Sequence, residues 1–151
     1  SNLPFPTYVV WLIIIMEQEN KKGKSKLDTY LKNLREKLIK KLGNHLDSLV
    51  SRGVLNAYKV KRDFGMGDST FNNLCQCNST ASPDTLDKMA FLIAYYLDQY
   101  DKELKAEPNG KSKQEKIDAL SEMKDEFKLL YGCRADIAIK MVNEQSELLT
   151  N

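Results

Sequence analysis

The sequence predicts an all-α protein, and three observations lead to that prediction. Apolar residues recur at spacings of three and four through most of the chain, which is the spacing of one helix face. The 151 residues include only 4 prolines and 7 glycines, so few positions oppose helix formation. Residue types that start and end helices also alternate at helical intervals. We expect about five to seven helices, with an apolar segment and polar linker over 1–24, a central domain over 25–105 and a helical hairpin over 106–151.

The first segment contains the most apolar run of the chain, YVVWLIIIM over 8–16, followed by a polar linker. The run is shorter than the roughly 20 residues that span a bilayer, and no basic residue precedes it as in a signal peptide, so we expect neither. Its β-branched and aromatic residues favour a short strand, which could pair with the same strand of a second copy. The alternative is that Met16 is the natural start and the residues before it are not native structure.

A leucine stripe after the linker predicts a basic amphipathic helix. Ser25 is suited to cap its start and Gly43 to end it, and lysine and arginine occupy the opposite face. We expect the stripe to pack within the domain, with pairing to a second copy as the alternative. The stripe consists of Leu27, Leu31, Leu34, Leu38 and Leu42, widened by Tyr30 and Ile39.

A separate short helix is expected over 44–52, with Asn44 as its cap and Gly53 as its exit. Leu46 and Leu49 mark its inner face. His45, the only histidine, is expected at the surface or at the boundary of the core.

The most informative stretch is AYKVKRDFGMGDSTFNNLCQ, which occupies 57–76. Its spacing predicts two short helices joined by a turn, with a glycine ending the first helix. Short oxygen-bearing side chains from Asp68 to Thr70 are suited to bond free N–H groups at the start of the second helix. The apolar and glycine positions that define this pattern are Val60, Phe64, Gly65, Met66, Phe71 and Leu74.

These six positions resemble the helix-turn-helix of the lambda-repressor, Cro and XRE family. In that family the first helix has apolar residues at motif positions four and eight, a glycine ends it, and an apolar residue lies in the turn. The run Ser82-Pro83-Asp84-Thr85-Leu86 is similar to the start of the next helix, so the resemblance covers about 44–100. One position departs, because Lys61 stands where the family usually has a small residue; its long stem could extend out of a tight contact.

The resemblance implies a sequence-specific DNA-binding transcriptional regulator, expected to be a repressor and a homodimer on a two-fold symmetric site. The helix over 68–77 would lie in the major groove of double-stranded DNA, where Asn and Gln can bond adenine N6 and N7. Basic side chains nearby would hold the phosphates. The expected base contacts are Ser69, Thr70, Asn72, Asn73 and Gln76, and the expected phosphate contacts are Arg52, Lys59, Lys61 and Arg62.

The charge distribution leaves an alternative open. Thirteen lysines and arginines face only three acids over 21–62, whereas ten face sixteen acids over 63–151. The basic half adjoins the motif and favours an anionic partner, although it could instead pair with the acidic half of the same molecule. The acidic half and Lys61 favour a second function, a protein–protein interaction module that keeps the fold without binding DNA.

The remaining sequence predicts three helices. Ser82 caps the first, Pro83 occupies its first position, and its apolar residues are so widely distributed that we expect cover on more than one side. The next helices, from about 112 to Gly132 and over 134–149, are expected to form an antiparallel hairpin over it. This hairpin also offers a surface for dimerisation.

Little in the sequence indicates an enzyme. It contains no Gly-rich phosphate loop, no zinc-ligand spacing and no nucleophile with a recognisable base. The three cysteines are an odd number, which favours a reducing, cytoplasmic compartment. We expect no metal, no cofactor, no membrane association and no small-molecule substrate. A small hydrolase or a membrane-associated protein has only scattered acids and the apolar run over 8–16 in its favour.

Overall fold

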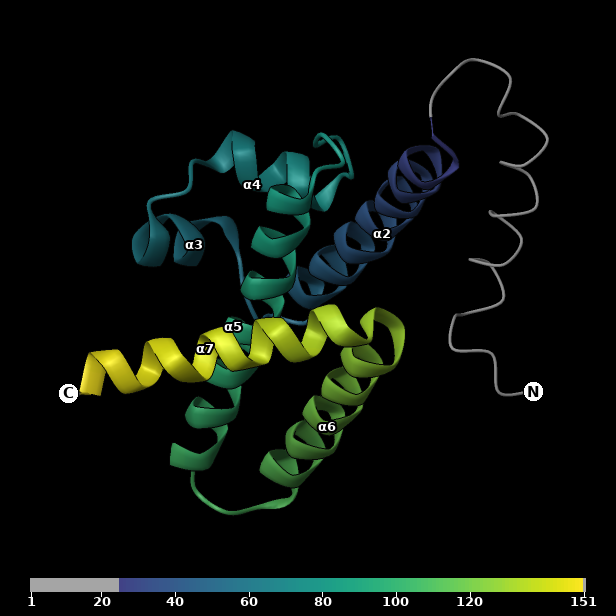
Figure 1. Cartoon of the computed structure of the whole chain (residues 1–151). Coiled ribbons are helices and arrows are strands. Elements are labelled where there is room, and N and C mark those ends of the chain that lie inside the picture. Colours follow the sequence, from purple (N-terminus) through teal and green to yellow (C-terminus); the bar gives the residue numbers. More distant parts are fainter. Residues whose placement is uncertain (1–24, 151) are drawn as a thin grey trace, which may run out of the picture.

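The computed structural model describes residues 25–150 and confirms the all-α class for that part of the chain (Figure 1). Side chains are described except those of Cys133, Ile137 and 145–150. The strand expected over 8–16 lies outside the described residues. The helices are α2 (Lys26–Ser51), α3 (Ala57–Phe64), α4 (Asp68–Cys75), α5 (Pro83–Ala106), α6 (Lys111–Tyr131) and α7 (Cys133–Thr150).

Helix α5 is the centre of the fold, because α2, α6 and α7 all pack against it. It has buried residues on most of its circumference, as its broad apolar surface predicts. The short helices α3 and α4 pack on each other at one end of the molecule, and α4 also contacts α2 (Figure 1). The core therefore runs from the α2–α4 contact along α5 to the C-terminal helices.

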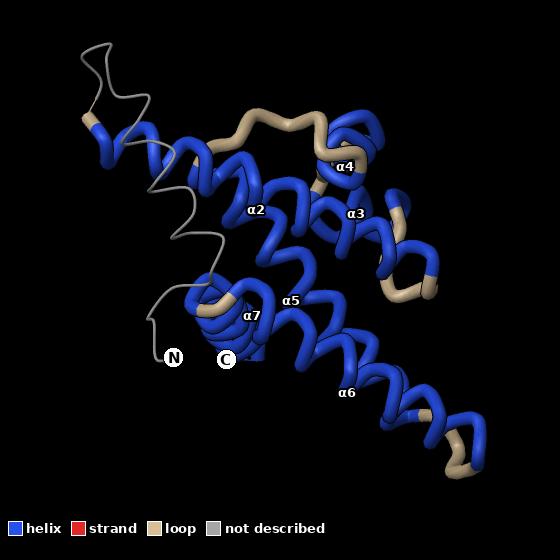
Figure 2. The backbone as a smooth tube through the Cα atoms, turned by 90° about the vertical axis from the view of Figure 1, so that its right-hand side faces the viewer, coloured by secondary structure: helices blue, strands red, loops and turns tan. Residues whose placement is uncertain are grey.

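The C-terminal helices differ from the predicted antiparallel hairpin. Helix α6 returns alongside α5, whereas α7 crosses α5 (Figures 1 and 2). Gly132 alone separates α6 from α7, at a φ of +55°. Antiparallel helix pairs need a loop of about two to five residues, so this connection is too short for a hairpin. The glycine ends α6 as predicted but redirects the chain onto α5.

Helix α2 is continuous, so the predictions that Gly43 ends a helix and that Asn44 caps another are wrong. Gly43 is buried where α2 meets the end of α4. A Cβ atom there would lie 2.5 Å from Cys77 Sγ and 2.8 Å from the Leu74 carbonyl oxygen. Glycine is thus required for a close approach of two helices rather than for a helix end.

The beginning of α2 does not pack as expected. Leu27 is 63% exposed and Leu31 is 36% exposed, and the buried residues of the helix begin only at Ile39. Figures 1 and 2 show this end of α2 projecting from the other described helices. The leucine stripe therefore packs within the domain only over its second half.

His45 is a core residue, which corrects its expected place at the surface or boundary. Its side chain is 6% exposed, and its ring lies 6.0 Å from the Phe127 ring and 5.6 Å from the Tyr131 ring of α6. The Tyr131 hydroxyl donates a 2.7 Å hydrogen bond to the Lys41 carbonyl oxygen. Burial lowers the pKa of His45, although Glu126 acts in the opposite direction.

Polar side chains cap three helix starts. The Ser25 and Ser82 hydroxyls accept from backbone N–H groups three residues later, as predicted. Asn56 Oδ1 accepts from the Lys59 N–H at 2.8 Å and so fixes the start of α3. Helix α4 follows Gly67 without a side-chain cap, so the caps expected from Asp68 to Thr70 do not form.

Candidate nucleic-acid interface

Helices α3 and α4 are joined by a turn of three residues, 65–67. Gly65 has a φ of +70°, and its N–H donates to the Lys61 carbonyl oxygen at 2.9 Å. This left-handed conformation ends α3 and suits glycine, as the sequence predicts. Met66 is half-buried in the turn. The local chemistry of the stretch thus produces two short helices that pack together.

One side of α4 anchors the helix and the other faces solvent. Phe71 and Leu74 are buried in the core. With 3.6 residues per turn, Ser69, Asn72, Asn73 and Gln76 fall within an arc of about 100° on the side away from Phe71, and Thr70 flanks that arc. All five expected base-contact residues are exposed: Ser69, Thr70, Asn72, Asn73 and Gln76.

The expected helix over 68–77 ends at Cys75, so Gln76 is its C-terminal cap residue and not an interior residue. The Gln76 side-chain oxygen accepts a 3.4 Å hydrogen bond from Asn78. Cys77 follows in a left-handed conformation, with a φ of +62°. Burial raises the pKa of the Cys75 thiol to about 11, so this thiol is protonated near neutral pH.

Helix α3 is held mainly by Val60, which is fully buried. Phe64 is 42% exposed, although its ring packs edge-on against the Phe91 and Tyr95 rings of α5 at 5.5 and 4.8 Å. Lys61, at the position where a small residue was expected, is exposed. Its side chain therefore leaves the α3–α4 contact and reaches solvent.

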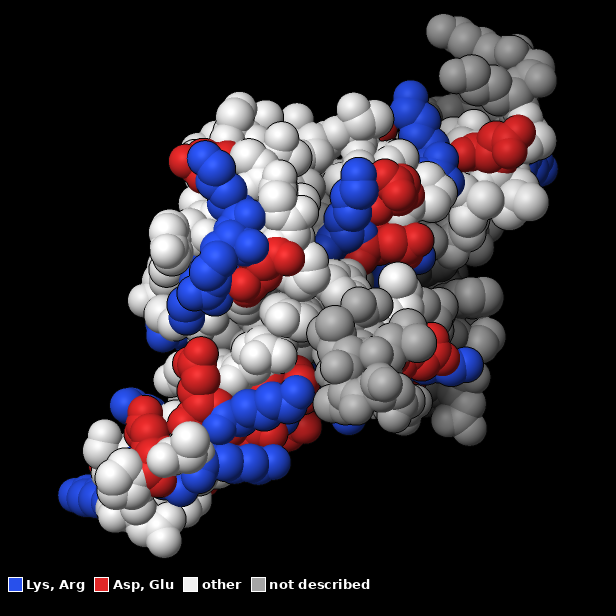
Figure 3. Space-filling model, turned by 90° about the vertical axis from the view of Figure 1, so that its left-hand side faces the viewer, with Lys and Arg blue, Asp and Glu red and all other residues white. Residues whose placement is uncertain are grey.

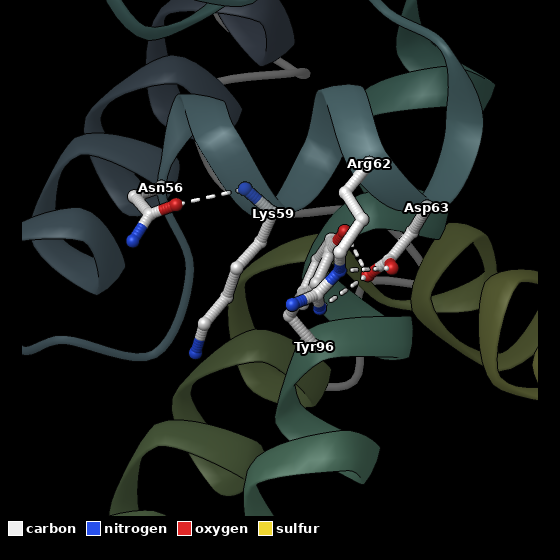
Figure 4. Close-up of polar contacts among 5 residues, drawn as sticks. All are labelled: Asn56, Lys59, Arg62, Asp63 and Tyr96. Atoms are coloured by element: carbon white, nitrogen blue, oxygen red, sulfur yellow. Dashed lines mark hydrogen bonds and ion pairs between the residues drawn. The ribbon is translucent and has the colours of Figure 1, made fainter.

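Asp63 joins α3 to α5 (Figure 4). Its carboxylate accepts from Arg62 Nε at 2.9 Å and from the Tyr96 hydroxyl at 2.9 Å. The hydrogen bond from the Arg62 guanidinium lowers the pKa of Asp63, and burial opposes this effect. Asp63 therefore remains ionised near neutral pH and holds the Arg62 guanidinium in an ion pair.

The four expected phosphate-contact residues lie in different environments. Arg52 and Lys61 are exposed and form no ion pair with any described residue, whereas Arg62 pairs with Asp63. Lys59 is half-buried and lines a small pocket of about 100 Å³ with Arg62, Asp63 and residues of α5 that include Glu103. Arg52 and Lys61 are thus better placed than Lys59 and Arg62 to meet an external anion.

Figure 3 shows the face of the molecule on which α3 lies. Lysine and arginine side chains are spread over its upper and lower parts, with acidic side chains between them. The basic surface on this face is therefore interrupted and not continuous. Part of the positive charge of the N-terminal half is compensated locally, as in the Arg62–Asp63 pair.

Sequence reasoning missed two side-chain contacts of this region. Tyr58 is exposed, and the Arg62 guanidinium lies 5.9 Å from its ring centre. The i,i+4 spacing of these residues was a usable signal for that contact. The Asp63–Tyr96 bond joins residues 33 positions apart and left no local signal.

No protein-family model, curated protein or solved structure matches this chain. None of the helices in the described range is long and apolar enough to cross a membrane. The described side chains include no group of three His, Cys, Asp or Glu residues that could hold a metal ion.

Proposed function

We propose that the protein is a sequence-specific DNA-binding transcriptional regulator that acts as a repressor, with α3 and α4 as its helix-turn-helix. The observation that carries this proposal is the solvent-facing arc of α4, whose amide and hydroxyl side chains project from a helix anchored by Phe71 and Leu74. An α-helix with its side chains is about 10–12 Å wide, and the major groove of B-DNA is about 12 Å wide.

The chemistry of the arc favours adenine. The side-chain amides of Asn72, Asn73 and Gln76 can each donate to N7 and at the same time accept from N6, which is the bidentate geometry that identifies this base. Ser69 and Thr70, nearer the start of α4, can bond base edges or phosphates. The protein would act by occupying its site on DNA, so no catalytic group is required.

Arg52 and Lys61 supply the phosphate contacts in this proposal. A homodimer with these two contacts in each protomer would neutralise about four phosphates, so the logarithm of affinity should fall with the logarithm of salt at a slope of about −3 to −4. Between 50 and 200 mM salt the affinity for a generic duplex should fall about a hundredfold. Fluorescence anisotropy of a labelled duplex titrated with the full chain measures this slope.

The control compares two lysine substitutions. Lys61→Gln should reduce the magnitude of the slope by about 2 in the dimer, whereas Lys140→Gln on α7 should leave it unchanged. Equal slopes for both variants would show that Lys61 does not contact a phosphate. Absence of binding at 50 mM salt would contradict the DNA proposal.

A protein–protein interaction module is the second candidate. It is favoured by the engagement of Arg62 with Asp63 and by the absence of Lys and Arg from α4. Tyr58 and Phe64 also expose aromatic surface on α3, which suits a protein partner. Failure to bind DNA at low salt, by a protein with intact helical content, would favour this candidate.

A further inference from the structure

A pocket of about 160 Å³ lies where α7 crosses α5 and α6. Its floor is apolar and is formed by Ala94 and Leu97 of α5, Phe127 of α6 and Val142 of α7, all buried. The pocket is remote in sequence from the α3–α4 unit, and no feature of the sequence indicated it. All three helices contribute residues to its lining, so the pocket depends on the path of α7.

The size of the pocket limits its occupant. An apolar cavity of about 150 Å³ in a protein core stays free of water and binds benzene. The pocket described here is of similar volume, so its floor accommodates one six-membered ring and little more.

The rim of the pocket carries charged side chains, which favour some ligands over others. Lys124, Lys128, Asp98 and Asn143 lie around the apolar floor. Lys124 pairs with Asp101 at 3.5 Å, and Asp98 pairs with Lys102 at 3.1 Å. Lys128 forms no ion pair with the side chains that the structure describes. The rim therefore offers a cation to an anionic ligand group.

We propose that this pocket binds a small apolar carboxylate that carries a single ring. The ring packs on Leu97, Phe127 and Val142, and the carboxylate meets the Lys128 ammonium at the rim. Burial of the ring supplies most of the affinity, and the charge pair selects an anion over a neutral compound of the same shape. This proposal can be tested whether or not the protein binds DNA, because ligand binding is measured on the protein alone.

Benzoate titrated into the full chain tests the proposal, with backbone amide shifts followed by NMR. We expect saturable shifts in α5, α6 and α7 around the pocket, with a Kd below about 1 mM. Benzyl alcohol, which has the same ring without the charge, should bind about tenfold more weakly. Absence of saturation at 20 mM benzoate, on the order of twenty times the expected Kd, would overturn the proposal.

Variants separate a ligand site from a mere gap in packing. Lys128→Gln should weaken benzoate about tenfold, whereas Lys140→Gln, which removes an exposed cation from α7, should not. Ala94→Leu should fill the pocket and abolish binding; if it fails to fold, Ile139→Phe fills the same space from α7. Equal losses from both lysine variants, or binding that persists in the filled variant, would show that benzoate binds elsewhere and would refute the site.

Discussion

Gly43 was expected to end a helix, but in the structure it lies inside one. A glycine after a leucine stripe is typical of a helix end, yet α2 continues through it because α4 approaches its Cα. In an exposed helix interior, alanine would be favoured over glycine by about 1 kcal/mol. At this contact the nearest atoms include the Leu74 carbonyl oxygen, which cannot move without α4.

Gly43→Ala should therefore destabilise the protein despite the gain in helix propensity. We expect the free energy of unfolding to fall by about 1–2 kcal/mol, since overpacking typically costs about 1–3 kcal/mol. Urea denaturation followed by circular dichroism measures the change. Ser48→Ala, at an exposed position of the same helix, should be neutral or slightly stabilising. A stabilised Gly43→Ala variant would contradict the close α2–α4 contact.

His45 predicts how stability depends on pH. Burial lowers its pKa below the ordinary value of 6.5, against a weaker opposing effect of Glu126 and with a small contribution from Arg52 in the same direction. The unfolded chain then binds a proton more readily than the folded protein. The stabilisation is complete above pH 6.5 and is lost as the pH falls toward the pKa of the folded state.

We expect the free energy of unfolding to decrease between pH 7.5 and 5.5, with a slope of up to about 1.4 kcal/mol per pH unit. His45→Leu removes the only histidine, so its stability should be nearly constant over the same interval. Denaturation curves at five pH values measure both. The same slope in both proteins would show that another group titrates.

For the helices, local signals predicted several caps and turns but failed at Gly43, at Asn44 and at the start of α4. The Ser25 and Ser82 caps, the left-handed Gly65 and the burial of Phe71 and Leu74 all follow from neighbouring residues, and the sequence predicted them. The path of α7 and the core position of His45 depend on residues far away in the chain. No periodicity within one helix could identify those contacts.

The same difference between neighbouring and distant residues applies to the candidate site. Which residues of α4 face outward is a matter of helical spacing, so their exposure could be predicted. Whether a given cation is free depends on its tertiary neighbours. Arg62 looks like Lys61 in the sequence, but Tyr96 holds Asp63 at the position where it can pair with Arg62.

Asp63→Asn tests this connection between α3 and α5. Loss of the charged hydrogen bonds should lower the free energy of unfolding by about 1–2 kcal/mol. It should also release Arg62, so that the salt slope of DNA binding steepens by about 1 per protomer. Glu144→Gln, at an exposed ion pair of α7, should change neither quantity. A destabilised variant with an unchanged slope would mean that Arg62 does not face DNA.

For the whole molecule, the projecting end of α2 exposes two leucines, Leu27 and Leu31, among basic side chains. We propose that Leu27 and Leu31 contact their counterparts in a second copy, because both leucines are exposed at the projecting end of α2. Sedimentation analysis should show a dimer for the natural chain and a monomer for the double variant Leu27→Asp/Leu31→Asp.

The C-terminal helices are the other candidate dimer surface. Leu129→Asp, at a highly exposed leucine of α6, tests that surface. We expect this variant to remain a dimer. Dissociation by Leu129→Asp alone would place the interface on the C-terminal helices. A natural chain that is monomeric at 100 µM would contradict the proposed homodimer.

If the proposed function is correct, the outward arc of α4 contacts bases, and selection of bound sequences from a random duplex pool tests for these contacts. The natural protein should enrich a two-fold symmetric motif with half-sites about 10 base pairs apart. Asn72→Ala/Asn73→Ala, with unchanged helical content, should bind without enriching that motif. No enrichment by the natural protein, or the same motif from the double variant, would contradict the claim.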